Sequence, residues 1–299
     1  MSPAPARDVV DIVSADLVRA LNDRAGLALE LTGLIDQGQS GAAFVRWPDG
    51  RESVVTTAFA SLDQMRQTAG VHNDVRGLGI PVPRHEFFLE VEPGTVAVVQ
   101  ERMPGSTVEQ ADTDGVEAVM AINERFAGLL RERKDVLPPP LSLGRSGDPT
   151  PSALVEEHSA RARALVARVR ATGAGPARDM VGDDLVHVDL TLSNMLFVGA
   201  TITGVVDWNY GVARGDRYFG LVKLLHTLSF ASESPSAGVK PTNAALERVE
   251  HVVSSVLHPE TLRRYWAHQT LNMLYGSLRW GTSEAFDTYL GMGEARLNT

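Results

Sequence analysis

The segment from residue 186 to residue 225 constrains the fold more than any other part of the chain (VHVDLTLSNMLFVGATITGVVDWNYGVARGDRYFGLVKLL). An apolar run at residues 195–198 and a β-branched run at residues 202–206 are separated by a short turn of glycine and small residues. This pattern is typical of a β-hairpin. Leucines at helical spacing follow within residues 216–230. The segment therefore predicts a loop, a hairpin, a second loop and a helix.

The hairpin brings two oxygen-bearing side chains together, because antiparallel pairing sets the start of one strand beside the end of the other. Asn194 directly precedes the first strand and Asp207 directly follows the second. An amide oxygen and a carboxylate suit Mg²⁺, which takes one or two carboxylates together with substrate phosphates. Asp189 lies a few residues upstream in an apolar frame, where it can accept a proton from a hydroxyl aimed at the same phosphate.

The spacing of these residues carries a resemblance to a known fold. His187-x-Asp189-x4-Asn194, followed by Val-Asp-Trp at residues 206–208, resembles the catalytic and metal loops of the protein-kinase-like fold. Val-Asp-Trp in place of Asp-Phe-Gly, and the Gly-Asp pair that ends at Asp216, are similar to the antibiotic phosphotransferases (aminoglycoside, hygromycin and related kinases). The resemblance implies a catalytic Asp189, metal ligands Asn194 and Asp207, and structural support from Asp216. His187 is expected to brace the loop rather than to react.

The resemblance implies an α+β fold of two lobes with the nucleotide in the cleft between them. Residues 1–103 should form the N-terminal lobe, an antiparallel sheet with helices, and residues 104–299 a larger, mainly helical lobe. The turn at residues 36–41 is rich in glycine, which lets backbone N–H groups approach a phosphate. By resemblance, the end of the last strand of the sheet is the hinge that holds adenine. The residues assigned to the nucleotide on these grounds are Gly38, Ser40, Gly41, Gln100, Glu101 and Met103.

The chain departs from the family pattern at three positions. The strand at residues 53–59 should carry a phosphate-binding lysine, yet no lysine precedes Lys134. The helix expected at residues 62–77 should supply the glutamate partner of that lysine, and it contains no glutamate. The family usually has a second supporting aspartate where Gly220 stands.

An arginine of the N-terminal lobe is the expected substitute for the missing lysine. Arg66 is the first candidate, because it lies on the helix that should pack behind the strand, and Arg46 and Arg51 follow. Arginine binds phosphate well, although its planar fork differs from the point charge of a lysine.

The remaining periodicity predicts further elements. Ser14 can cap a first helix, and strands are expected near residues 86–91 and 96–100. The buried helical face that begins at Val116 should continue to Leu130. Longer helices are expected at the positions that follow: one over residues 151–172, one over residues 242–257 and one over residues 259–276.

Composition sets broad limits. The 299 residues suit about two domains, and 43% hydrophobic content is enough for a core. A net charge of −9 argues against nucleic acid as a partner. No apolar run is long enough to cross a bilayer and the N-terminus has no apolar signal core, so we expect a cytoplasmic protein without a membrane partner. The absence of cysteine excludes disulfides and thiol chemistry.

Acidic side chains in the C-terminal part could recognise a cationic acceptor through charge-assisted hydrogen bonds. The candidates are Glu156, Glu157, Glu233, Glu284 and Asp287. Carboxylates in a first helical turn are ordinarily complements of the helix dipole, which is the alternative for the first two.

The predicted function is O-phosphorylation of a polycationic antibiotic, an aminoglycoside or a viomycin–capreomycin-type peptide, by ATP (or GTP) with Mg²⁺, conferring resistance. One alternative is a metabolic small-molecule kinase of the choline or homoserine type. The other is a nucleotide-binding pseudokinase that acts as a scaffold.

Overall fold

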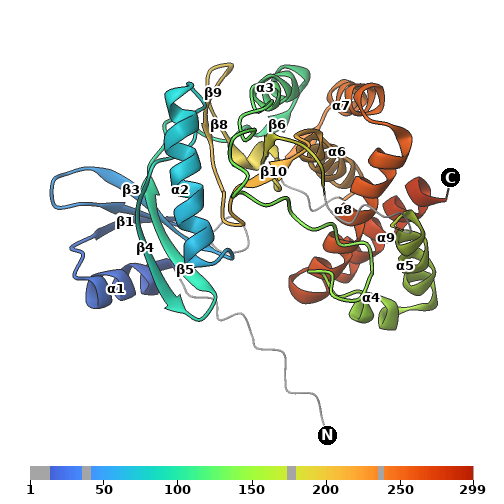
Figure 1. Ribbon diagram of the computed structural model, residues 1–299, viewed down its shortest axis with the longest axis horizontal. Helices are drawn as coiled ribbons and strands as arrows, with labels where there is room; N and C mark the ends of the chain where they lie inside the picture. The colour runs from blue at the N-terminus through green and yellow to red at the C-terminus, as the bar shows by residue number, and fades with distance from the viewer. Residues whose placement is uncertain (1–13, 36–41, 174–179, 235–238, 299) are drawn as a thin grey trace, which may run out of the picture. The chain divides into compact units, whose positions relative to one another are not determined.

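The structure is a computed structural model that describes residues 14–35, 42–173, 180–234 and 239–298. The described chain forms two compact units, and Figure 1 labels the elements of each. Unit 1 contains the described residues up to Met103 together with Trp208–Gly211. Unit 2 contains Pro104–Asp207 and the described residues from Val212 onward.

Unit 1 is built on an antiparallel sheet of five strands in the order β1-β2-β3-β5-β4. Its elements are α1 (Ser14–Ala25), β1 (Glu30–Ile35), β2 (Ala42–Arg46), β3 (Glu52–Ala58), α2 (Leu62–Gly77), β4 (His85–Glu92) and β5 (Thr95–Glu101). The predicted N-terminal antiparallel sheet is thereby confirmed. The predicted helix over residues 62–77 is confirmed as α2, which a capping box of Ser61 and Gln64 starts.

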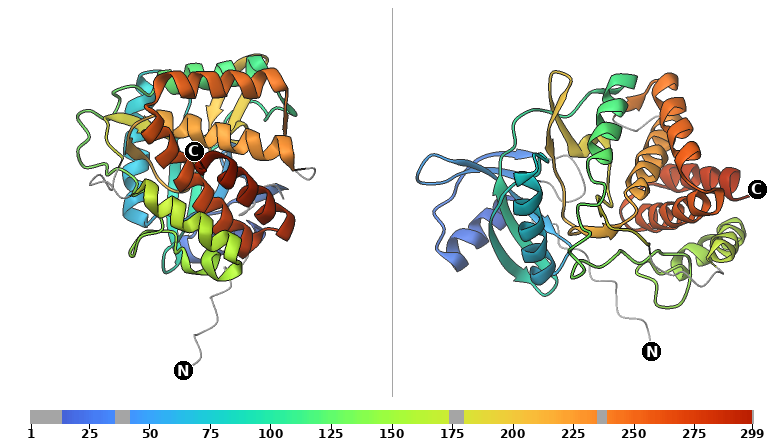
Figure 2. Two further views of the ribbon diagram at one scale, coloured as in Figure 1. Left: turned by 90° about the vertical axis from the view of Figure 1, so that its right-hand side faces the viewer. Right: turned by 45° about the horizontal axis from the view of Figure 1, so that its top comes forward.

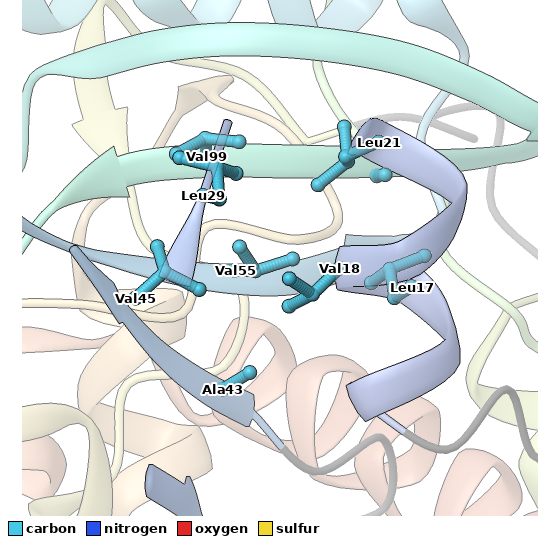
Figure 3. Packing of buried hydrophobic residues seen from close by; sticks show 9 residues of the cluster. Leu17, Val18, Leu21, Leu29, Ala43, Val45, Val55 and Val99 are labelled. Carbon is cyan, nitrogen blue, oxygen red and sulfur yellow. The ribbon is translucent and has the colours of Figure 1, made fainter. Parts of the chain in front are cut away.

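The sheet of unit 1 buries both faces, because side chains alternate along each strand. On β5, Ala97 and Val99 belong to the core that includes Leu17 and Leu21 of α1 (Figure 3). The intervening Val96 and Val98 belong to a second cluster with Met65 of α2. Helices α1 and α2 therefore cover opposite faces of the sheet, and β3 lies at its centre.

Unit 2 is mainly helical, as predicted. Its short β elements are β6 (Gln110–Ala111), β7 (Asp184–Val186), β8 (Met195–Val198), β9 (Thr201–Val205), β10 (Ala213–Gly215) and β11 (Lys240–Pro241). Its helices are α3 (Thr113–Glu124), α4 (Ala153–His158), α5 (Ala160–Thr172), α6 (Tyr218–Glu233), α7 (Asn243–Val256), α8 (Pro259–Trp280) and α9 (Ser283–Leu297), with a 3₁₀ turn at Leu192–Asn194. Helix α8 contacts α5, α6 and α9, and Figure 2 shows these helices side by side.

Two predicted helix boundaries in unit 2 are wrong. The single helix predicted over residues 151–172 is divided at Ser159, whose backbone is extended and whose side chain accepts from Ala162 N–H, so that it begins α5. The helical face predicted to reach Leu130 ends with α3 at Glu124. Phe126 and Leu130 are still buried, but in turns whose backbone bonds to the segment of β7.

Helix α9 was not predicted. Its sequence signal is Thr282, which accepts from Ala285 N–H and so caps a new helix after Gly281. Helix α8 also runs beyond the predicted residue 276, to Trp280. Within the described residues, no helix is both long and apolar enough to cross a membrane.

Candidate active site

The loop after β7 is held by a buried histidine. Asp189 N–H donates to His187 Nδ1 at 3.2 Å, so the ring proton lies on Nε2, which donates to Val206 O at 2.9 Å. Burial lowers the pKa of His187 and keeps the ring neutral. His187 thus ties the backbone at Asp189 to the end of the β8–β9 hairpin.

The hairpin is confirmed, with Met195 opposite Val205. At the end of the hairpin opposite the turn, Val206 N–H donates to Asn194 O at 2.9 Å. Asn194 and Asp207 therefore leave the same end of one hairpin, as the sequence predicts.

Asn194 also joins the hairpin to Asp189. Its Nδ2 donates to the backbone O of Asp189 at 2.8 Å and to the carboxylate Oδ2 at 3.1 Å. Because the amide nitrogen donates to Asp189, the amide oxygen Oδ1 of Asn194 can coordinate a cation or accept a hydrogen bond. The Asn194 amide therefore orients the Asp189 carboxylate on one side and presents an oxygen on the other.

Asp207 has an unusual backbone. Its φ of 64° is the only positive φ of a non-glycine residue in the described chain. Such a conformation costs about 1–3 kcal/mol and persists only where the surroundings impose it, often at functional sites. Aspartate tolerates it better than most residues. The half-buried carboxylate of Asp207 and the amide oxygen of Asn194 fit a magnesium ion that takes its other ligands from water and phosphate.

The structure reveals a residue at this site that sequence reasoning missed. Lys223 of α6 lies with Nζ 3.0 Å from Asp189 Oδ1. Burial opposes ionisation of Asp189, but the charge of Lys223 and hydrogen bonds from Lys223 and Asn194 hold the pKa of Asp189 below its ordinary value. The available signal was a lysine inside the otherwise apolar LVKLL run of α6.

Asp216 lies at the start of α6. Its Oδ1 accepts from Tyr218 N–H at 2.9 Å, and its Oδ2 accepts from the Tyr265 hydroxyl of α8 at 3.0 Å. Burial raises the pKa of Asp216. Asp216 thus connects α6 to α8, and its support of the catalytic loop stays a prediction that would act through α6.

The comparisons with known proteins decide the family. Residues 33–253, more than half of the chain, match the family profile described as phosphotransferase enzyme family. The chain belongs to this family. Its members are small-molecule phosphotransferases that act on hydroxyl groups. Among curated proteins, none matches the chain by sequence.

Solved structures show the same fold. A thermostable mutant of the aminoglycoside phosphotransferase APH(4)-Ia, in ternary complex with ADP and hygromycin B, superposes with a TM-score of 0.66 at 17% identity, covering 96% of this chain and 98% of that one. An amicoumacin kinase bound to AMP-PNP, Ca²⁺ and its antibiotic gives 0.65 at 12% identity, with 94% and 93% covered. The macrolide 2′-phosphotransferase MphH from Brachybacterium faecium gives 0.54 at 18%, with 95% and 98% covered. These likenesses confirm the predicted protein-kinase-like fold.

The nucleotide-binding residues predicted for this phosphotransferase lie in unit 1. Gly38, Ser40 and Gly41 fall outside the described residues. Gln100 and Glu101 end β5, where Glu101 N–H donates to Arg84 O at 2.8 Å. The hinge assignment of Gln100, Glu101 and Met103 stays a prediction.

Neutral side chains occupy the region of the missing lysine. Thr56 of β3 is buried, and Asn209 Nδ2 donates to its hydroxyl at 3.3 Å. The backbone O of Asn209 accepts from the N–H groups of Phe59 and Ala60, at 2.9 and 3.1 Å. The segment that follows Asp207 is thus fixed to β3 by hydrogen bonds.

The three candidate arginines lie on the surface of unit 1, each in an ion pair. The pairs are Arg66–Asp63 at 3.3 Å, Arg46–Glu30 at 3.2 Å and Arg51–Asp49 at 2.7 Å. Arg66 is exposed on α2, whereas the inward face of that helix carries Thr68 and His72. Exposed pairs contribute about 0–1 kcal/mol, so Arg66 and Arg46 can leave their pairs at little cost when a phosphate competes. Arg51 also pairs at 2.9 Å with Glu86, whose side chain is only 8% exposed.

We expect Arg66→Ala to weaken nucleotide binding about tenfold or more, the worth of a hydrogen bond to a charged group, and Arg46→Ala and Arg51→Ala to weaken it less. Titration calorimetry with AMP-PNP and Mg²⁺ measures the affinities. Arg19→Ala is the matched control, because Arg19 also forms an exposed pair three residues along a helix, with Asp16 of α1. If all three variants bind as tightly as Arg19→Ala, arginine does not replace the lysine.

The acidic residues predicted for the acceptor fall into two classes. Glu156 accepts from Arg170, at 3.1 Å from Nη1 to Oε2, and from the Ser152 hydroxyl at 2.8 Å. The bond from Arg170 lowers the pKa of Glu156, whose charge is thus already balanced. The others are exposed, and Glu157, Glu233 and Glu284 have no ion pair within the described residues.

Helix α9 contacts the two other helices that carry these acidic positions, α4 and α6. Phe286 packs on His158 at the end of α4, with ring centroids 4.0 Å apart. In the sequence, Glu157 directly precedes His158 and Asp287 directly follows Phe286. Tyr289 stacks on Phe230 of α6, one turn before Glu233, with centroids 4.3 Å apart. Burial raises the pKa of Tyr289 to about 12, and the charge of Asp189 adds to the increase.

Proposed function

We propose that this phosphotransferase moves the γ-phosphoryl group of ATP to a hydroxyl of a polycationic antibiotic, an aminoglycoside or a viomycin–capreomycin-type peptide, and so confers resistance. The observation that carries the proposal is the fixed carboxylate of Asp189, held between Asn194 and Lys223 in a loop tied to the metal-side hairpin. Neighbours of the same fold include kinases of aminoglycosides, amicoumacin and macrolides, which supports an antibiotic acceptor.

In this proposal Asp189 accepts the proton of the acceptor hydroxyl while the hydroxyl oxygen bonds to the γ-phosphorus and the bond to the β-phosphate oxygen breaks. Products are the phosphate ester and ADP. Asn194 Oδ1 and the Asp207 carboxylate would hold Mg²⁺, which offsets phosphate charge when bound. The hydrogen-bonded loop presents the Asp189 carboxylate in one orientation, which lowers the entropy lost on reaching the reactive geometry.

Acceptor charge is inferred from the surface around α9. Glu157, Glu233 and Glu284 lie on α4, α6 and α9 and form no ion pair within the described residues, so a cationic acceptor would gain charge-assisted hydrogen bonds there. Glu156 contributes least, because Arg170 competes for it. Macrolides and choline carry one positive charge and should be poorer acceptors on this argument.

One alternative has its own structural support. The neutral Thr56 and Asn209 at the place of the family's lysine favour a nucleotide-binding scaffold that does not turn over ATP. The intact Asp189, Asn194 and Asp207 oppose it. ADP release with an acceptor present separates the two. A metabolic kinase would share every one of these catalytic residues, so only an acceptor screen identifies it.

We expect expression in a sensitive bacterium to protect it against at least one polycationic antibiotic, and the Asp189→Asn variant to remove that protection. In vitro, rising salt should raise the acceptor KM, because added ions shorten the Debye length, which is about 8–10 Å near 0.1 M salt, and so weaken the attraction between exposed charges. The measurement is ADP release against acceptor concentration at several salt concentrations. Protection against no polycationic drug, together with phosphorylation of a neutral metabolite, would overturn the proposal.

A further inference from the structure

The ion pair between α6 and the catalytic loop has a role beyond the residues already assigned. We propose that Lys223 is a positioning residue of the phosphotransfer site, which holds the Asp189 carboxylate from the α6 side so that it faces the acceptor hydroxyl. The inference rests on the proposed function only through the role of Asp189 as base.

Lys223 is placed to serve Asp189 alone. The residue is 7% exposed, and Asp189 is its only anionic partner among the described residues. Its other close contact is the sulfur of Met273 at 3.8 Å. Burial lowers the pKa of the neighbouring His226 and His268 to about 3, so neither adds a competing charge. A lysine in this setting is costly to bury unless a carboxylate balances it.

The geometry of α6 explains why the contact comes from residue 223. Gly220 packs directly on the loop: a Cβ at this position would lie 3.1 Å from Leu190 Cδ2 and 3.2 Å from His187 O. A side chain at position 220 would therefore crowd the loop. Lys223 lies three residues further along the same helical face and spans the distance with its long stem. The close approach of the α6 backbone to the loop at Gly220 thus places Lys223 within reach of Asp189.

Lys223 and Asn194 act on different oxygens of the same carboxylate. Lys223 Nζ contacts Oδ1, and Asn194 Nδ2 donates to Oδ2 at 3.1 Å. Asn194 comes from the hairpin and Lys223 from α6, so two separate elements set the plane of the carboxylate. Removal of Lys223 leaves one of these contacts and lets the side chain rotate. A misplacement of about 1 Å in a catalytic group can cost about 10² in rate.

The test is a cycle of Lys223→Met, Asp189→Asn and the double variant, with Lys223→Arg as the conservative replacement. We expect Lys223→Met to lower kcat by about 10² while the acceptor KM and the AMP-PNP affinity stay near parental values. Lys223→Arg should restore part of kcat. In the Asp189→Asn background, Lys223→Met should cause no further loss. Lys134→Met is the matched control, because Lys134 pairs with Asp183 on the surface of unit 2.

Each rate is measured with the acceptor found in the antibiotic screen. It is also measured as ATP hydrolysis in the presence of Mg²⁺, in which water accepts the γ-phosphoryl group. Thermal unfolding of all variants is measured in parallel. A Lys223→Met variant that melts earlier but keeps the kcat of Lys134→Met would show a purely structural role and overturn the proposal. A further loss of kcat in the Asp189→Asn background would also overturn it, because Lys223 would then act independently of Asp189.

Failure of the proposed function gives a different pattern. If no antibiotic is phosphorylated but the cycle holds for hydrolysis by water, the acceptor assignment falls and the Lys223 inference stands. If the parent protein turns over no ATP at all, the proposed function is wrong. The thermal unfolding data then test whether Lys223 and Asp189 interact. Additive shifts in Tm for the two single variants would then overturn the pairing, and coupled shifts would support it.

Discussion

Replacement of Asp189 by asparagine is expected to lower the phosphoryl-transfer rate by a factor of about 10²–10⁴, the usual contribution of a general base. Asparagine keeps the size of the side chain but cannot take the proton from the acceptor hydroxyl. The loop itself should remain in place, because His187 contacts the backbone N–H of residue 189 and Asn194 contacts its backbone oxygen. Nucleotide affinity should therefore stay nearly unchanged.

The measurement is ADP release at saturating acceptor, with nucleotide affinity from calorimetry and Tm from thermal unfolding. The Tm is needed because asparagine leaves the buried charge of Lys223 without its carboxylate. Ser193→Ala is a control for local disturbance in the same loop, since its hydroxyl lies 2.8 Å from the Thr191 hydroxyl rather than against Asp189. Near-parental turnover of Asp189→Asn with the true acceptor would show that Asp189 is not the base.

The parts of the site that sequence reasoning predicted are those set by local rules. A glycine turn between an apolar run and a β-branched run defines the β8–β9 hairpin, and antiparallel pairing then places Asn194 near Asp207 without knowledge of the rest of the chain. The helix predicted over residues 62–77 is observed at those bounds as α2, and the structure adds the capping box of Ser61 and Gln64 that starts it.

The parts that were missed depend on contacts between distant elements. Nothing near Lys223 in the sequence shows that its ammonium reaches Asp189, 34 residues upstream by residue number, because the contact depends on how closely α6 approaches the loop at Gly220. Similarly, Thr56 and Asn209 become partners only when the segment after Asp207 packs on β3. The absence of a lysine was visible in the sequence, but the hydrogen bonds that occupy its place were not.

Helix α9 shows how one missed boundary affects a functional prediction. Glu284 and Asp287 were assigned to the acceptor from charge alone, without an element to carry them. The structure places them on the first turns of a helix that contacts α4 through Phe286 and α6 through Tyr289. Their position relative to α4 and α6 is therefore set by α9, whose start depends on the cap at Thr282. The structure thus gives Glu284 and Asp287 a common element, helix α9, which their charge alone did not indicate.

Removal of the Asp207 carboxylate should abolish Mg²⁺-dependent activity. A bound metal contributes several kcal/mol to such reactions, and each 1.36 kcal/mol is a factor of ten, so we expect Asp207→Ala to lose about 10³-fold or more. Asn194→Ala should instead raise the Mg²⁺ concentration needed for half-maximal activity, because a neutral amide oxygen contributes less than a full negative charge. Asn194→Ala also removes the hydrogen bonds to Asp189, so its kcat should fall as well.

The backbone at Asp207 requires its own control, since alanine is strained at a φ of 64°. Asp207→Asn keeps a side chain that tolerates this conformation and removes only the charge. Both variants should lose activity if the charge binds the metal, whereas loss in the alanine variant alone would point to backbone strain. Activity is titrated with Mg²⁺ for each variant, and Tm is recorded. Unchanged metal dependence in the Asp207 and Asn194 variants would rule out this pair as the metal ligands, because at least one must alter the titration if either oxygen binds the ion.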